Sequence, residues 1–388
     1  MKERKLYINL EGDKTIWAVV FLLMLASILV VYSATGALAY KNAEGNTWHY
    51  FLKHGMFLVV GFFAMYVTHI IPHRYYARLG QLAFFISLGL LMYTLVAGVN
   101  LNNASRWISI GGHSLQTSDV AKLALMMFLA RQLVKCKDYL HDLKEVAWKL
   151  FAPLTAVCAL IFPANFSTAA LVMLTGLCLL FLGGVYFRHL VAYVGGMVGV
   201  AALVIVLALY VPAIQQAFPR AQTWVNRVEN FSADKSENSD AFYQVAQAKI
   251  AVVNGGLKGR GPGKSIQRNT LPHPYSDYIY AIIIEEYGLI GGTFILILYM
   301  VFFFRGRRIF SLANDPYGAY LAMGLSLSLV IQALVNMAVA VDLFPVTGQT
   351  LPLVSMGGTS IIFTCITIGI ILSVSRDLNI SKVKYAAI

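Results

Sequence analysis

The sequence predicts an all-α fold, a polytopic membrane helix bundle with ten transmembrane helices, and three observations lead to this class. First, 58% of the residues are hydrophobic and the mean hydropathy is +0.68. Second, only 12% of the residues are charged, about half the share that is usual in a soluble domain. Third, apolar runs of roughly 20 residues recur along nearly the whole chain, and each can cross a bilayer as a helix.

Ten spans are predicted from these apolar runs. The fourth and fifth spans are the shortest, so a total of nine or eleven spans is also possible. The first run ends in Ala37-Leu38-Ala39, which resembles a signal-peptide cleavage site, but its apolar core is longer than a usual signal core. We therefore expect a retained helix there. The predicted spans are 15–38, 51–71, 79–98, 120–134, 146–162, 167–187, 190–211, 278–304, 317–341 and 351–374.

Basic residues predict which way the bundle faces. The short segments between spans are alternately rich and poor in Lys and Arg, and the richer segments belong in the cytoplasm. Both termini are therefore expected in the cytoplasm, and residues 212–276 form a large extracytoplasmic loop between helices 7 and 8. The whole chain, residues 1–388, is then a single transmembrane domain. The net charge of +12 follows mainly from this bias, so it does not indicate a nucleic-acid partner.

An amphipathic helix is predicted inside the long loop, over about residues 240–253. Ser239 and Asp240 can cap its start, and Gly255 follows its end. Apolar residues recur at helical spacing on one face, which is typical of a helix that lies in the membrane interface. Such a helix would hold the glycine-rich stretch that follows it at the depth of the lipid headgroups.

The stretch GGLKGRGPGKSIQR, residues 255–268, looks at first like a nucleotide-binding loop. A Walker loop ending in Gly263-Lys264-Ser265 requires glycine at position 258, where this chain has lysine. The stretch also follows a helical pattern and is expected outside the cell, so an ATP site is disfavoured. Its glycines and cations suit the pyrophosphate of a lipid-linked substrate, and the alternative is a connector that contacts anionic lipids. The cations are Lys258, Arg260, Lys264 and Arg268.

Asp277 stands where the long loop meets the eighth span. A carboxylate at a helix start is favoured by the helix dipole and can simply be a cap. Beside a basic loop at the membrane border, it is also where a general base for a lipid-linked substrate would be needed. Glu285 and Glu286 follow inside the span, where ionisable side chains usually face the bundle interior or a cavity. A structural pairing, for instance with Lys122, is the alternative for at least one of them.

Two further segments carry polar or irregular patterns. Arg106 and Trp107 fit an anchor at the outer interface, while Asp119 and Lys122 are spaced to pair on one helix face. Residues 343–359, LFPVTGQTLPLVSMGGT, are dense in Pro and Gly and predict an irregular or re-entrant entry to the last span. Irregular backbone at membrane depth is tolerated only where it is buried in protein or lines a cavity. The segment therefore indicates a site inside the bundle, with a packing kink as the alternative.

Together these segments resemble the SEDS family of cell-wall proteins (shape, elongation, division and sporulation), in order and spacing over essentially the whole chain. Within that family, NFSTA and SMGGTS are more similar to the cell-division branch than to the elongation branch. The stretches that carry the resemblance are YSAT at 32–35, ASRWISI with QTSDVAKLAL, NFSTAALV, QAKIAVVNGGLKGRGPGKS with LPHPYSDYIYAIIIEEYGLIGG, and LFPVTGQTLPLVSMGGTS.

The resemblance implies a peptidoglycan glycosyltransferase that polymerises lipid II at the outer face of the cytoplasmic (inner) membrane, for septal wall synthesis. The family's essential aspartate falls on Asp277, so the resemblance implies a catalytic base there. The loop cations, with or without a divalent cation such as Mg or Mn, would stabilise charge on the leaving pyrophosphate. Arg106, Lys122 and Glu286 would shape the cavity or orient the acceptor. The expected partners are lipid II, membrane lipids, a class B penicillin-binding protein (transpeptidase) and other division proteins.

Three positions depart from the family pattern and put only secondary roles in question. Asn165 and His273 stand where the family has acidic residues, and Asp119 stands where it has Glu.

A transporter that flips lipid II without bond formation is a rival, because it explains ten helices and intramembrane charges equally well. Two more rivals are an elongation-type polymerase and a purely structural division scaffold. Asp277 distinguishes the polymerase from the flippase, because a flippase needs no general base at the outer interface.

Overall fold

The computed structural model describes residues 11–36, 38, 47–101, 104–110, 113–210, 240–272 and 274–386. Within these residues the protein is a helix bundle with one small sheet. The predicted loop residues 212–239 and His273 lie outside the described residues. The helices are α1 (Lys14–Ala34), α3 (Thr47–Ile70), α4 (His73–Ala97), α5 (Thr117–Lys135), α6 (Leu143–Val146), α7 (Ala152–Ile161), α8 (Phe166–Leu182), α9 (Phe187–Tyr210), α12 (Asp240–Gly255), α13 (Ile279–Leu312), α14 (Pro316–Ala340) and α15 (Thr359–Ala386).

Each of the ten predicted spans overlaps a helical segment, so the mainly helical membrane class is confirmed. Seven helices of the described chain are long and apolar enough to cross a membrane: α1, α3, α4, α9, α13, α14 and α15. The fifth span is an α6–α7 run that contains a π-helical turn at Ala147–Phe151. The predicted start of the last span at residue 351 is wrong, because α15 begins at Thr359 and the preceding residues are irregular.

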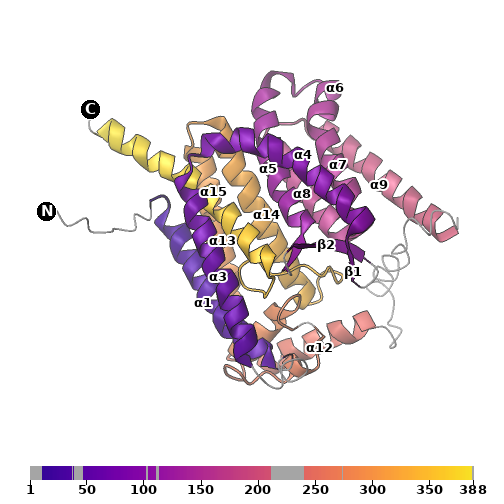
Figure 1. Cartoon of the computed structure of the whole chain (residues 1–388), viewed down its shortest axis with the longest axis vertical. Coiled ribbons are helices and arrows are strands. Elements are labelled where there is room, and N and C mark those ends of the chain that lie inside the picture. Colours follow the sequence, from indigo (N-terminus) through magenta and orange to yellow (C-terminus); the bar gives the residue numbers. More distant parts are fainter. Residues whose placement is uncertain are drawn as a thin grey trace.

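The bundle is organised around α14. Its apolar window is 72% buried, against 6% for α9, which projects from the side of the bundle in Figure 1. Helix α14 is started by Asp315, whose side chain accepts a hydrogen bond from the Gly318 backbone N–H, with Pro316 in the first turn. Because α13, α5, α8 and α15 all pack on it, α14 is the element from which polar side chains can reach the centre of the molecule.

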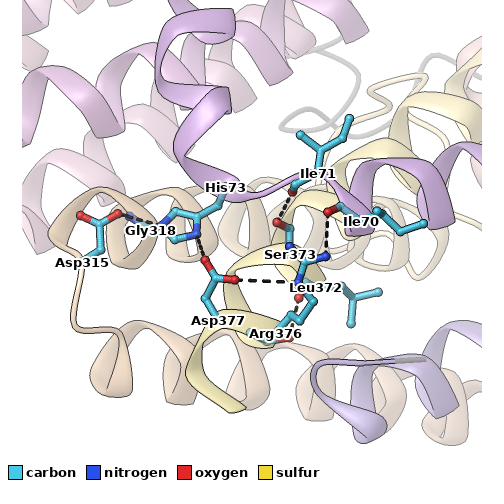
Figure 2. A network of polar contacts seen from close by, with 10 residues as sticks. Ile70, Ile71, His73, Asp315, Gly318, Leu372, Ser373, Arg376 and Asp377 are labelled. Atoms are coloured by element: carbon cyan, nitrogen blue, oxygen red, sulfur yellow. Dashed lines mark hydrogen bonds and ion pairs between the residues drawn. The ribbon is translucent and has the colours of Figure 1, made fainter. Parts of the chain in front are cut away.

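The start of α1 and the end of α15 lie at one end of the bundle, and α12 lies at the other (Figure 1). At the first end, His73 at the start of α4 joins three helices (Figure 2). Its Nε2 is 2.8 Å from a carboxylate oxygen of Asp315 on α14, and its Nδ1 is 2.8 Å from one of Asp377 on α15. The imidazole is buried, so this polar cluster ties the helix ends together from within the protein.

A three-stranded antiparallel sheet precedes α5 and was not predicted from the sequence. Its strands are β1 (Val99–Leu101), β2 (Ala104–Ile110) and β3 (His113–Gln116), in the order β1-β2-β3. Trp107 pairs with Gln116, which places the start of α5 beside Arg106. The signal in the sequence was ISIGGHSL, in which apolar and polar residues alternate around a Gly-Gly pair, as in a hairpin.

Candidate functional site

Asp277 lies in a turn immediately before α13 and is half-buried. The cap position of α13 is Tyr278, so Asp277 stands one residue outside the helix and does not occupy its cap. One carboxylate oxygen accepts a hydrogen bond from the Ser276 hydroxyl at 2.9 Å. Burial, and then the nearby Tyr50 and Asp277, raise the pKa of the Tyr275 phenol above its usual value. A neutral phenol therefore lies near this carboxylate.

The backbone around Asp277 is held by α14 and by the irregular segment 343–358. The side-chain amide of Asn336 donates to the Asp277 carbonyl at 2.9 Å and to the Gln349 carbonyl at 2.6 Å. The Ser355 hydroxyl donates to the Ser276 carbonyl at 2.6 Å, and the Met356 N–H donates to the Tyr275 carbonyl at 2.9 Å. Three consecutive carbonyls are thus fixed, which leaves the Asp277 side chain on a rigid support.

The irregular segment also approaches the Asp277 carboxylate itself. Gly348 has a φ of +65°, and a Cβ atom there would lie 3.6 Å from Asp277 Oδ2. The next residue, Gln349, donates to the Thr168 hydroxyl of α8 at 2.7 Å. The segment therefore bridges α8, α14 and the turn before α13, and the predicted irregular entry to the last helix is part of the site.

Lys122, on α5, contacts the same face of α14 as this support. Its Nζ is 2.8 Å from a carboxylate oxygen of Asp119, the predicted partner, and 3.1 Å from the side-chain oxygen of Gln332. Gln332 donates in turn to the Thr350 carbonyl at 2.9 Å. Gln332 and Asn336 are one helical turn apart, so one face of α14 contacts both Lys122 and Asp277. A hollow of about 30 Å³ lies beside Lys122 and is lined by Asp119, Gln332, Ser360 and Thr364 among others.

Arg106 lies beside a second hollow at the end of the sheet. Its Nε donates to the Ala164 carbonyl at 2.9 Å, in the turn before α8. Asn165, which stands where the related pattern is acidic, caps α8 by accepting from the Thr168 N–H at 3.3 Å. Asn165 is not acidic, but its side chain still caps α8, and Arg106 lies next to this cap.

The glycines of residues 255–268 allow a close backbone contact inside the protein. Helix α13 is broken at Gly288, where φ is +70° and ψ is −174°. The loop donates to the carbonyls exposed by this break, from Arg260 N–H to Glu285 and from Gly261 N–H to Glu286, both at 2.9 Å. A side chain at Gly259 would clash with the Glu286 carbonyl, and one at Gly288 would clash with the Leu257 carbonyl. Only glycine permits this approach of two backbones.

The end of the same loop surrounds a carboxylate of the protein itself. Glu285 is fully buried and accepts hydrogen bonds from the backbone N–H groups of Ile266, at 3.1 Å, and Gln267, at 3.2 Å. The Ser265 hydroxyl donates to it as well. The GKS sequence that resembles a phosphate-binding loop thus places its serine and the following amides around Glu285, so these groups already have an anionic partner.

Glu286 and Arg268 connect the loop to α1. Glu286 is buried and accepts a hydrogen bond from the Ser33 hydroxyl. The Arg268 guanidinium donates to the Ser33 carbonyl and to its hydroxyl, each at 3.2 Å. Ser33 therefore stands between Glu286 and Arg268. Lys122 pairs with Asp119, so the alternative pairing of Lys122 with a glutamate of α13 is not seen.

The remaining three loop cations, Lys258, Arg260 and Lys264, are exposed. The loop that carries them is fixed on α13 at both ends, by the Gly288 contact and by Glu285. In the described ranges no group of three His, Cys, Asp or Glu side chains is arranged to hold a metal ion.

Gln332, Asn336 and Gln349 were not predicted from the sequence, and the available signal was an amide pair at i, i+4 inside an apolar span.

The fold and the site define a multi-pass membrane protein that holds an aspartate at one end of its helix bundle. Its sequence matches the family model described as cell cycle protein, the FtsW, RodA and SpoVE family, over residues 13–380, and the chain belongs to this family. The resemblance to the SEDS family is thereby confirmed.

Among individual proteins, the chain is similar to FtsW proteins. It is 32% identical to the probable peptidoglycan glycosyltransferase FtsW of Nitrosococcus halophilus, covering 92% of this chain and 90% of that protein. It is 31% identical to the probable FtsW enzyme of Trichlorobacter lovleyi, covering 97% of each chain. It is also 30% identical to stage V sporulation protein E of Bacillus subtilis, covering 94% of this chain and 97% of that protein.

Solved structures share the fold. One comes from work on the structural coordination of polymerization and crosslinking by a peptidoglycan synthase complex, with a TM-score of 0.71 and 23% identity over 96% of this chain and 99% of that chain. Another is the rod shape determining protein RodA of Thermus thermophilus, with a TM-score of 0.64 and 22% identity over 94% of this chain and 97% of that chain.

Proposed function

We propose that this protein is a peptidoglycan glycosyltransferase of the FtsW type, which polymerises lipid II into glycan strands at the outer face of the cytoplasmic membrane during septal wall synthesis. The names of its relatives support the activity, and their coverage of nearly the whole chain supports its transfer. The chain acts as one domain of ten membrane helices, with both termini in the cytoplasm and α12 in the outer interface. Asp277 and the exposed loop cations then face the extracytoplasmic side.

In this mechanism Asp277 is the general base. Its carboxylate removes the proton from the 4-hydroxyl of the acceptor lipid II as that oxygen attacks the anomeric carbon of the donor strand. The new glycosidic bond forms while the bond between the anomeric carbon and the pyrophosphate oxygen breaks. Because a hydroxyl is far less acidic than a carboxylic acid, proton removal has to accompany bond formation. Undecaprenyl pyrophosphate leaves with the bonding electrons.

The leaving pyrophosphate gains negative charge as the bond breaks. Lys258, Arg260 and Lys264 are the exposed cations of the loop and would stabilise this charge. Arg268 would hold the loop on α1 through Ser33. A Mg or Mn ion bound with the pyrophosphate would add to the same stabilisation.

The acceptor would lie along the face of α14 that links Lys122 to Asp277. Lys122 and Arg106 each line a hollow, and both would orient the sugar or its peptide. Glu286 would act indirectly, through Ser33 and the loop.

The observation that carries the proposal is the support of Asp277. Its carbonyl and the two carbonyls before it are each hydrogen-bonded to α14 or to the irregular segment, while its carboxylate is half-exposed beside Gly348. A structural cap needs no such support, and a general base depends on fixed geometry.

The test is reconstitution of the full chain in vesicles that carry lipid II on the accessible side, with a class B penicillin-binding protein as partner. We expect glycan ladders with the parent protein, and a loss of about 100-fold or more in rate with Asp277→Asn. Asp138→Asn changes an exposed carboxylate in the same way and should leave the rate unchanged. Ladders of unchanged rate with Asp277→Asn would disprove the mechanism.

The same vesicles distinguish the flippase. Movement of lipid II across the bilayer without ladder formation would favour a transporter, and absence of both activities would favour a division scaffold. Omission of the transpeptidase tests whether that partner activates the polymerase. Fluorescent fusions in dividing cells test the septal location against the elongation-type alternative.

A further inference from the structure

A basic hollow lies at the end of the bundle opposite to Asp277. Its cavity volume is about 330 Å³, against about 30 Å³ for the hollow beside Lys122. It is formed where the start of α1 meets the ends of α13 and α15, the end of the bundle at which α1 and α15 approach the termini in Figure 1. The side chains that matter below are Asp13, Lys14, Arg305, Arg308, Leu312 and Leu378.

The single acidic side chain in the described lining is already engaged. One oxygen of Asp13 accepts from the backbone N–H groups of Thr15, at 2.9 Å, and Ile16, at 3.2 Å. The second oxygen accepts from Arg305 Nε at 2.8 Å. Asp13 thus neutralises Arg305 and caps α1, and it offers no counter-charge to the rest of the hollow.

Lys14 and Arg308 therefore give the hollow two surplus positive charges. Both are exposed, and neither has a hydrogen bond or ion pair to another of the described residues. They stand on different helices, α1 and α13, each within three residues of a member of the Asp13–Arg305 pair. An anion in the hollow can therefore meet cations from two helices.

The rest of the described lining includes apolar side chains at the last turns of α13 and on α15. Leu312 is 44% exposed, Ile309 is buried behind it, and Leu378 of α15 completes this side. Leu312 and Leu378 follow the basic residues of α13 and α15, so they lie on the side of the cations that faces away from the membrane core. There they can contact the glycerol of a lipid headgroup whose phosphate meets the cations at the membrane border.

We propose that this hollow binds the phosphate headgroup of an anionic phospholipid in the cytoplasmic leaflet. Basic pockets between membrane helices at the cytoplasmic side are suited to such headgroups. The site is separate from the polymerase site, since it lies at the far end of α13. The bound lipid would join α1 to α13 and α15 across the Asp13–Arg305 pair.

The test is a binding titration of the purified full chain with short-chain phosphatidylglycerol, read by native mass spectrometry. Each cation near a lipid phosphate strengthens binding by roughly fivefold, so Lys14→Gln with Arg308→Gln should raise the dissociation constant about 25-fold. Short-chain phosphatidylcholine should bind the parent protein much more weakly, because its headgroup carries no net charge.

Matched variants separate this site from a general effect of charge. Arg307→Gln with Lys144→Gln removes two exposed cations that do not line the hollow, and it should change the dissociation constant less than twofold. Lys14→Arg with Arg308→Lys keeps both charges and should retain tight binding, which also checks that the positions tolerate substitution.

Equal loss of binding in the two glutamine pairs would overturn the proposal, because the effect would then reflect overall charge. Displacement of the lipid by millimolar inorganic phosphate, with tight binding of phosphate alone, would also overturn it in favour of a free-phosphate site. None of these readouts uses glycan synthesis, so failure here leaves the proposed polymerase untouched.

Discussion

The side-chain amide nitrogen of Asn336 donates to the backbone carbonyls of Asp277, at 2.9 Å, and Gln349, at 2.6 Å. One buried side chain on α14 thereby fixes the distance between the turn that carries the aspartate and the irregular segment that faces its carboxylate. The geometry of the proposed base depends on a helix that carries no proposed catalytic residue.

Asn336→Leu keeps the side-chain volume but leaves both carbonyls without this donor. We expect a loss of about 1–3 kcal/mol in stability and a fall of at least tenfold in the rate of glycan synthesis. Thermal unfolding and ladder formation measure the two effects. Asn254→Leu is the control, because Asn254 is exposed at the end of α12. A parent-like rate in Asn336→Leu would show that the support is dispensable.

Gly288→Ala tests the contact between the loop and the broken helix. The positive φ of +70° is strained for any residue with a side chain, and the new methyl group would meet the Leu257 carbonyl. We expect a loss of about 3 kcal/mol or more, measured by denaturation in detergent. Gly89→Ala, in the middle of α4 with open space around it, should be neutral or stabilising by up to about 1 kcal/mol. Equal effects of the two variants would refute this account of Gly288.

Glu285→Gln tests whether the loop is closed around that carboxylate. The variant loses charge-assisted hydrogen bonds from Ser265, Ile266 and Gln267. Hydrogen exchange of the Ile266 and Gln267 amides should accelerate about tenfold or more, while exchange in the middle of α14 stays slow. Glu145→Gln, which removes a surface partner of Lys149, should not change exchange in the loop.

His73→Gln tests the polar cluster of His73, Asp315 and Asp377 at the opposite end of the bundle. The change removes a buried ring that reaches both Asp315 and Asp377, so two carboxylates lose a shared partner (Figure 2). We expect a loss of about 1–3 kcal/mol in thermal stability with little direct effect on chemistry at Asp277. His141→Gln changes an exposed histidine and should be silent. A stability unchanged by His73→Gln would mean that the cluster adds nothing to the bundle.

The helical class could be predicted from the sequence because hydrophobic length is a local property. Each apolar run carries its own evidence, which is why ten predicted spans overlap ten helical segments. The last boundary could not be placed in this way, since residues 351–358 are apolar enough for a helix but are held irregular by contacts with Tyr275 and Ser276. Those contacts come from 79 residues away for Ser355 with Ser276, and from 356 − 275 = 81 residues away for Met356 with Tyr275.

In the candidate site, one pairing of charged residues could be predicted from the sequence, but the contacts between distant segments could not. Asp119 and Lys122 are three residues apart and could be paired from their spacing alone. The partners of Ser33, Glu285 and Asn336 lie in distant segments, so no local pattern indicates them. The GKS stretch was interpreted through its likeness to a ligand-binding loop, whereas its partner is a glutamate 20 residues further on.

The contact between Glu285 and the loop affects how the loop can bind a leaving group during each round of polymer growth. A tethered carboxylate competes with outside anions at an effective concentration in the millimolar range or above, so it keeps the amides of the loop occupied. In the proposed mechanism an incoming pyrophosphate would then be met by long, flexible Lys and Arg side chains and not by a rigid backbone cradle. Flexible point charges can follow a phosphate through small displacements. Such contacts suit a leaving group that must be released and replaced after every sugar addition.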